Sequence, residues 1–231
     1  MPEWWTYGLS DFLLFSPRTY VRLIELYHLS VWPAQLLAIV AGLVLLAALL
    51  FHHPITRWTT PGLLALAWLW VAWAWFGERY ATINWAAPYA GLAFAAEGLL
   101  LLLLAVLPPS RPARPVVRGV ATVVILAGLV GLPLLGWLWA GRGIHQVDLF
   151  GLDPDPTALV TIGMLLAMHG WVARLALLLP LLWLVVAAVT LQAMDQPGAW
   201  FAPAIGMLGY LGVGTCLWTT RQRGTSADAA T

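Results

Sequence analysis

The sequence contains no lysine, and all eleven of its basic residues are arginine. Schiff-base chemistry therefore has no amine to use, which excludes a retinal-type photoreceptor. A single cysteine, Cys216, excludes a disulfide framework, a cysteine-based zinc site and a CxxC redox pair. The net charge is only +1 and no basic stretch is interleaved with aromatic residues, so nucleic acid is not an expected partner.

Charged residues are also scarce. They make up 9% of the chain and hydrophobic residues 61%, against roughly 25% and 45–50% in an ordinary soluble domain. This composition indicates a protein whose solvent is the lipid bilayer. The sequence has no GxSxG or HExxH motif and no Ser/His/Asp grouping, so we expect no enzymatic activity.

The apolar segments predict an all-α integral membrane protein with about seven transmembrane helices. They lie at 32–51, 61–77, 86–107, 117–140, 156–171, 174–193 and 199–219. We expect residues 32–219 to form a single membrane domain and residues 220–231 a disordered cytoplasmic tail. The fifth segment spans only about 24 Å, so a short or half-penetrating helix is the alternative there, with Asp155 as its N-cap and Pro156 in its first turn.

Residues 1–31 differ from the spans in carrying frequent charges. Ser16 and Pro17 suit an N-cap and first helical position, and the helix that follows is amphipathic. We expect it to lie in the membrane interface, with its aromatic residues at headgroup depth. These are Trp4, Trp5, Tyr20 and Tyr27.

The arginines predict the orientation. With the amino end outside and seven crossings, seven arginines lie inside and four outside, which favours N-out and C-in under the positive-inside rule. The inner arginines are Arg57, Arg111, Arg114, Arg118, Arg174, Arg221 and Arg223, and the outer ones are Arg18, Arg22, Arg79 and Arg142.

Glu97 is the one acidic residue expected near the bilayer midplane, since about ten apolar residues flank it on each side. Ala93 and Ala90 stand one and two turns before it, and such small residues let a neighbouring helix approach closely. Glu97 is therefore expected to face the bundle, either as a proton carrier, cation ligand or substrate contact, or as a protonated acid that hydrogen-bonds a neighbouring helix.

The fifteen tryptophans mostly lie near predicted helix ends, as in interfacial belts. Trp68, Trp70 and Trp73 lie deeper, where they either pack in the core or line a cavity for a planar or cationic ligand.

Two further groups of residues suggest bound metals or cofactors. The predicted outer loop places four candidate metal ligands close in sequence, although two Asp-Pro turns and helix capping explain its aspartates without a metal. These ligands are His145, Asp148, Asp153 and Asp155. Haem ligation by His169 with His52 or His53 is the other possibility. The simpler explanation of these histidines is that they lie at helix C-terminal ends, where the helix dipole favours them. We expect no cofactor.

Three motifs resemble a bacterial multi-helix integral-membrane family of unknown function. They are WPAQ at Trp32–Gln35, YATINWAAPY at Tyr80–Tyr89 and FGLDPDPTALVTIGMLL at Phe150–Leu166. The resemblance covers nearly the whole chain and implies a single-domain, multi-pass protein of the bacterial inner membrane. It supplies no activity, cofactor or catalytic residue. It draws attention to the polar and aromatic positions of the motifs, namely Trp32, Gln35, Asn84, Trp85, Asp153 and Asp155.

The leading functional hypothesis is a permease for a small solute, ion or proton, with Glu97 as its midplane group. Its other candidate contacts are Asn84, Gln35, Trp85 and His169. One alternative is a non-catalytic subunit or assembly factor, whose partners are other membrane subunits or further copies of the chain. The other is a haem- or metal-bearing redox anchor that uses His169.

Overall fold

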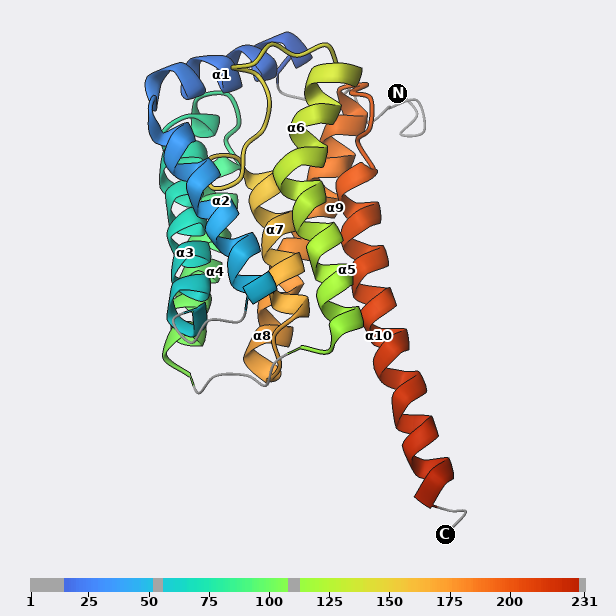
Figure 1. Ribbon diagram of the computed structural model, residues 1–231. Coiled ribbons are helices and arrows are strands. Elements are labelled where there is room, and N and C mark those ends of the chain that lie inside the picture. The colour runs from blue at the N-terminus through green and yellow to red at the C-terminus, as the bar shows by residue number, and fades with distance from the viewer. Residues whose placement is uncertain (1–14, 52–55, 108–112, 229–231) are drawn as a thin grey trace, which may run out of the picture.

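The computed structural model describes residues 15–51, 56–107 and 113–228, and every regular element in these ranges is helical. The helices form an elongated bundle, and α1 (Pro17–Ser30) lies across one end of it, nearly at right angles to the others (Figure 1). We call this the α1 end. As predicted, Ser16 is the N-cap of α1, where its Oγ accepts a hydrogen bond from the Thr19 amide at 3.2 Å, and Pro17 is the first helical residue.

Two of the helices in the bundle are extended by π-helical turns. α3 (Thr56–Trp70) continues through Val71–Gly77, where the Glu78 amide bonds to the Trp73 carbonyl five residues back. α5 (Pro115–Leu126) continues through π-helical turns and α6 (Leu132–Leu134) to Trp139. The other helices are α2 (Ala34–Phe51), α4 (Ala87–Val106), α7 (Pro154–Leu166), α8 (Trp171–Ala176), α9 (Leu178–Ala193) and α10 (Phe201–Asp228).

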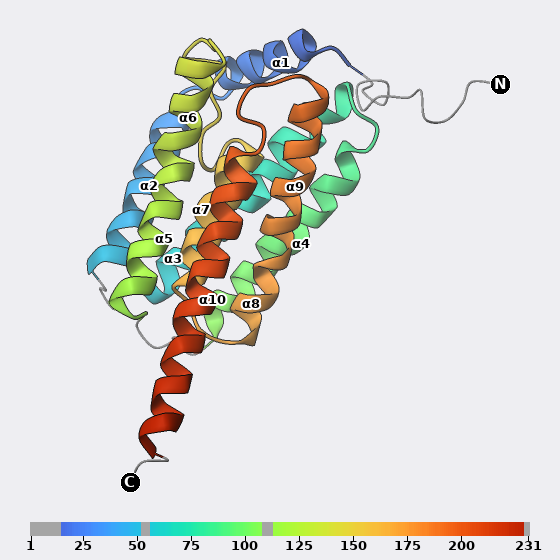
Figure 2. The same ribbon diagram turned by 90° about the vertical axis from the view of Figure 1, so that its right-hand side faces the viewer.

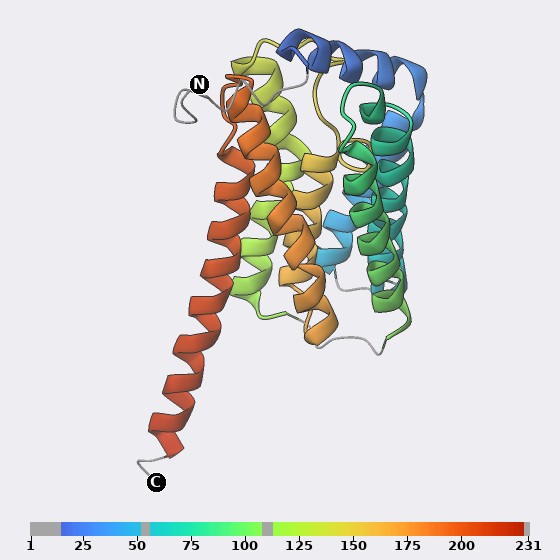
Figure 3. The same ribbon diagram turned by 180° about the vertical axis from the view of Figure 1, so that it is seen from behind.

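The helices alternate in direction. α2, α4, α7 and α10 run away from the α1 end, and α3, α5 with α6, and α8 with α9 return to it (Figures 1 and 3). Five stretches in the described residues are long and apolar enough to cross a membrane, so the chain has the character of a multi-pass membrane protein. They are Ala34–Phe51, Trp58–Thr82, Ala87–Val106, Pro115–Trp139 and Trp171–Ala193.

The two remaining predicted spans differ from expectation. α7 ends at Leu166 rather than residue 171, and it begins at Pro154, so Asp153 and not Asp155 holds the N-cap position. α10 continues to Asp228, so residues 220–228 are helical where we expected a disordered tail. This part of α10 projects beyond the bundle, as Figure 2 shows.

α7 is the central helix of the bundle and packs against α3, α5, α9 and α10. All its residues except Asp155 are buried, and it starts well below the α1 end (Figure 1). Two glycines allow α5 and its π-helical extension to touch it. A Cβ on Gly163 would lie 2.6 Å from the Ile125 side chain and 3.0 Å from the Ala121 carbonyl oxygen, and one on Gly128 would lie 2.8 Å from Val160.

We expected α1 to present its aromatic residues to the headgroups, but the structure places them differently. Tyr27 is fully buried and Tyr20 is half-buried, because the apolar face of α1 packs on the bundle. Ile24, Tyr27 and His28 share this face at the i, i+3, i+4 spacing of a helix. Trp4 and Trp5 lie outside the described residues.

Replacing Gly163 by alanine is expected to lower the free energy of unfolding in detergent by about 1–3 kcal/mol, because the added methyl group forces α5 and α7 apart. Gly119→Ala, also at the end of the bundle away from α1, is the matched control, since nothing lies within 4 Å of its added Cβ. Denaturant titration of both variants measures the difference. Equal stability of the two would contradict the close contact between the helices.

Candidate binding site at the buried start of α7

The segment between Trp139 and Pro154 folds into the bundle instead of lying over it as the predicted outer loop. Gly141 and Gly151 adopt φ values of 64° and 78°, which other residues rarely adopt, and so allow the chain to turn inward. Val147, Phe150 and Leu152 are buried and attach the segment to the core. α7 therefore begins inside the protein, with its aspartates below the surface.

An ion pair between His28 and Asp153 joins this segment to α1. The His28 Nε2 group donates to Asp153 Oδ2 at 2.8 Å, and each side chain is only 1% exposed. The Leu149 amide donates to the same oxygen at 2.7 Å. Burial by itself lowers the pKa of His28, but the charge and hydrogen bond of Asp153 outweigh it and raise the pKa above its usual value.

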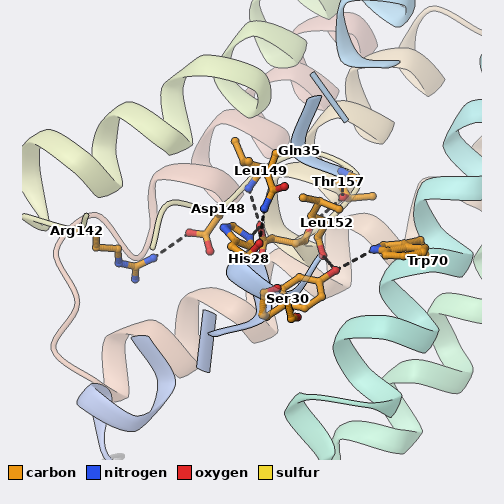
Figure 4. A network of polar contacts seen from close by, with 12 residues as sticks. His28, Ser30, Gln35, Trp70, Arg142, Asp148, Leu149, Leu152 and Thr157 are labelled. Carbon is orange, nitrogen blue, oxygen red and sulfur yellow. Dashed lines mark hydrogen bonds and ion pairs between the residues drawn. The ribbon is translucent and has the colours of Figure 1, made fainter. Parts of the chain in front are cut away.

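Hydrogen bonds around this pair fix the same junction (Figure 4). The Tyr27 hydroxyl donates to the Leu152 carbonyl at 3.2 Å and accepts from Trp70 Nε1 at 2.9 Å. Gln35 Nε2 donates to the His28 carbonyl at 2.6 Å. Residues from α1, α2, α3 and the inward segment thus meet at one buried polar cluster.

The first turns of α7 carry a second line of hydrogen bonds. Thr157 Oγ1 donates to the Asp153 carbonyl at 2.6 Å and accepts from the Gly151 amide at 2.8 Å. One turn later, Thr161 Oγ1 donates to the Thr157 carbonyl and accepts from Trp68 Nε1 at 2.8 Å. These contacts satisfy polar groups that are buried in the bundle, where an unpaired donor or acceptor would be costly.

Arg142 forms the second ion pair of the inward segment. Its Nη1 group lies 3.0 Å from Asp148 Oδ2, and its Nη2 group donates to Gln196 at 3.3 Å. Arg142 is only 8% exposed, and within the described residues its Nε group has no acceptor. Burial raises the pKa of Asp148, and the Arg142 charge opposes this effect.

Two small cavities lie beside the start of α7. The first, of about 40 Å³, has Arg142, Asp148, Asp155 and Gln196 in its wall, and we call it the arginine cavity. A water molecule needs about 10–15 Å³ measured in this way, so this cavity has room for about three.

The second cavity, of about 20 Å³, is the aromatic cavity. Its wall is made by four aromatic side chains, by Asp155, and by three residues from the C-terminal half of α9. The aromatic residues are Tyr20, Trp75, Tyr80 and Trp183, and the α9 residues are Ala187, Thr190 and Leu191. Burial, together with the charge of Asp155, raises the pKa of Tyr20 well above its usual value, so this phenol stays neutral.

Asp155 lies between the two cavities and lines both. Trp183 Nε1 donates to its Oδ1 at 2.9 Å. It is the one residue of α7 that is not buried. Because it lies in the first turn, the positive end of the helix dipole stabilises its carboxylate.

The π-helical turns after α3 position two walls of this site. Ala74, Trp75 and Phe76 are consecutive and all buried, because the wider turn directs all three inward. Trp75 reaches the aromatic cavity, and Phe76 packs edge-on against Trp183 with ring centroids 5.1 Å apart.

The candidates for transport contacts are not gathered at one place. Glu97 is 3% exposed in the middle of α4, and its Oε1 has no hydrogen-bond donor among the described residues. Asn84 accepts from the Ala86 amide just before α4 and Gln35 supports His28, so both have structural partners. Trp85 and His169 are exposed.

The proposed metal ligands are also separated. His145 is exposed, Asp153 is paired with His28 and Asp148 with Arg142. Among the described residues, no three His, Cys, Asp or Glu side chains lie close enough to hold a metal ion. For the haem hypothesis, His52 and His53 lie outside the described residues.

The sequence analysis missed His28, Trp75, Trp183 and the partners of Arg142. His28 could have been found from its place on the apolar face of the amphipathic helix, where an ionisable group needs a buried partner. Of the deep tryptophans, Trp68 and Trp70 hydrogen-bond Thr161 and Tyr27 and so pack in the core.

Asp153→Asn is expected to lower the free energy of unfolding by about 3–5 kcal/mol at mildly acidic pH, because it leaves a buried imidazolium without its counter-charge. Pairing raises the pKa of His28 in the folded state above its pKa of about 6.5 in the unfolded state. The stabilisation by the ion pair is therefore complete below about pH 6.5, and it is lost as the pH rises through the pKa of the folded state. The gap between wild type and variant should therefore narrow as pH rises.

Thermal unfolding in detergent across this pH range measures that gap. His145→Asn is the matched control, since it removes an exposed histidine of the same inward segment and should leave the pH profile unchanged. A gap that stays constant with pH would contradict the ion pair.

The comparisons with known proteins identify a family and nothing more. No curated protein and no solved structure matches the chain. The model of a family of unknown function, DUF6064, matches residues 18–226 and so includes α1, the inward segment and all the helices that line the two cavities. This confirms the resemblance seen in the three motifs, and the chain belongs to the DUF6064 family of unknown function.

Proposed function

We propose that the protein is a permease for a small cation or proton, with its entry site at Asp155. The observation that carries the proposal is the buried start of α7, which brings a carboxylate onto two cavities beneath α1. Interrupted helices of this kind form the solute sites of many transporters, because irregular backbone at membrane depth is tolerated where it is buried or lines a cavity.

In this proposal the chain crosses the bacterial inner membrane seven times, with the α1 end outside. The alternating directions of the helices support seven passes (Figure 1). α7 is about 20 Å long, and the inward segment occupies the rest of the membrane thickness beside it. Seven arginines against four then place the positively charged loops inside.

Glu97 is the second carboxylate of the proposed pathway. Trp183, which holds Asp155, also packs against Phe94 with ring centroids 5.0 Å apart, and Phe94 stands one turn before Glu97 on α4. Phe76 contacts both rings, at 4.7 Å from Phe94 and 5.1 Å from Trp183. We call these three side chains the aromatic layer. It separates the two carboxylates in the closed state, and transport requires it to open.

Flux into proteoliposomes tests the proposal, with protons, sodium, potassium and methylammonium as separate probes. Asp155→Asn and Glu97→Gln should each lower the initial rate about tenfold or more, because a contact to a charged group is worth about 1.5–3 kcal/mol. Both substitutions keep the size of the side chain.

The matched control is Asp195→Asn, which removes an exposed carboxylate at the same end of the bundle as Asp155. Asp195 has a φ of 53°, a conformation that asparagine also adopts, so this variant should fold and transport normally. Absence of flux for every probe in the wild-type protein would reject the permease. Wild-type rates in both carboxylate variants would reject the pathway.

A further inference from the structure

We infer that the aromatic cavity binds a small ammonium-type cation, ammonium or methylammonium, between the Asp155 carboxylate and the four aromatic rings. The inference rests on the proposed function in treating this cavity as a solute site, and it goes further by naming the chemical class of the solute. Charge, wall chemistry and volume support it separately.

Among the described residues near the start of α7, Asp155 is the carboxylate that forms no ion pair. His28 is paired with Asp153, and Arg142 is paired with Asp148. Asp155 accepts a hydrogen bond from the neutral indole N–H group of Trp183, and it shares the wall of the arginine cavity with Arg142, which is paired elsewhere. A carboxylate held in a protein interior without a counter-charge favours a cation beside it, and a single remaining charge suits a monovalent one.

The walls of the cavity favour an organic or ammonium cation over a metal ion. The rings of Tyr20, Trp75 and Tyr80 pack on one another with centroids 5.8–6.1 Å apart, and all three line the cavity, so a cation in it lies beside aromatic rings that attract positive charge. Trp183 closes a further side. Hard divalent cations require six or more oxygen ligands, which a wall made mainly of ring carbons does not supply.

The volume limits the size of the ligand. About 20 Å³ accommodates one or two water-sized groups, which fits ammonium or methylammonium. A tetramethylammonium ion, with four methyl groups around its nitrogen, is too large. The side chain of Tyr20 comes from α1, so this helix forms part of the cavity wall.

Equilibrium dialysis of radiolabelled methylammonium against the full-length protein in detergent tests the inference. The expected result is saturable binding of one ion per chain, displaced by ammonium but not by sodium or tetramethylammonium at the same ionic strength. Asp155→Asn and Tyr80→Leu should each weaken binding about tenfold or more. Trp139→Phe, which alters an exposed tryptophan at the same end, should leave it unchanged.

Gel filtration and thermal unfolding establish that each variant is folded. Trp183→Phe provides a second test of binding, because it keeps an aromatic ring at this position. This variant removes the hydrogen bond to Asp155 but keeps an aromatic wall, so it should weaken binding less than Tyr80→Leu. No saturable binding by the wild type, equal displacement by sodium, or unchanged binding by Asp155→Asn would each overturn the inference.

The binding result is separate from the flux result. Binding of methylammonium without flux of any probe supports the cation site and rejects the permease. Flux of another cation without methylammonium binding keeps the permease and rejects the ammonium site.

Discussion

The buried ion pair of His28 and Asp153 is the contact on which the α1 end of the molecule depends. It joins residues 125 positions apart in the sequence, and neither partner reaches solvent. Two such groups are stable in the interior only together, so α1 must lie on the bundle and the inward segment must fold below it at the same time. The position of Asp155, two residues further on, follows from this arrangement, as does the wall that Tyr20 contributes to the aromatic cavity. Because removing one partner of such a pair is costly, the pair can determine which of several packings the chain adopts.

Much of the fold could be predicted from the sequence, because it follows from local and additive properties. Apolar runs of sufficient length indicate membrane helices, Ser16 and Pro17 indicate a helix start, and small residues before Glu97 indicate that it faces a neighbouring helix. The family resemblance also depended on short contiguous motifs and was confirmed. What these features share is that each depends on a few neighbouring residues, whose effects do not change with the tertiary structure.

The candidate site could not be predicted in this way, because its residues are defined by what they pack against. Hydropathy treats the segment before α7 as an outer loop, since its aspartates and glycines resemble turn residues. Its burial becomes favourable only because Asp153 pairs with His28 of α1 and Asp148 with Arg142. The amphipathic pattern of α1 is the same whether its apolar face meets lipid or protein, which explains why Tyr27 was placed at the headgroups and is in fact buried. The π-helical turns that direct Trp75 and Phe76 inward have no recognised sequence pattern.

Asp155 and Glu97 form no ion pair among the described residues, and they differ in a way that favours distinct roles. Asp155 has a hydrogen-bond donor and two cavities beside it, so a ligand or water can compensate its charge. Glu97 borders neither of these cavities, and its Oε1 has no donor among the described residues. In the proposed pathway, a cation reaches Glu97 only after it has passed the aromatic layer. In the proposed permease, Glu97, which stands out in the sequence, is therefore better suited to a step after the aromatic layer opens, whereas Asp155, which becomes prominent only in the folded chain, is better suited to recognition of the solute.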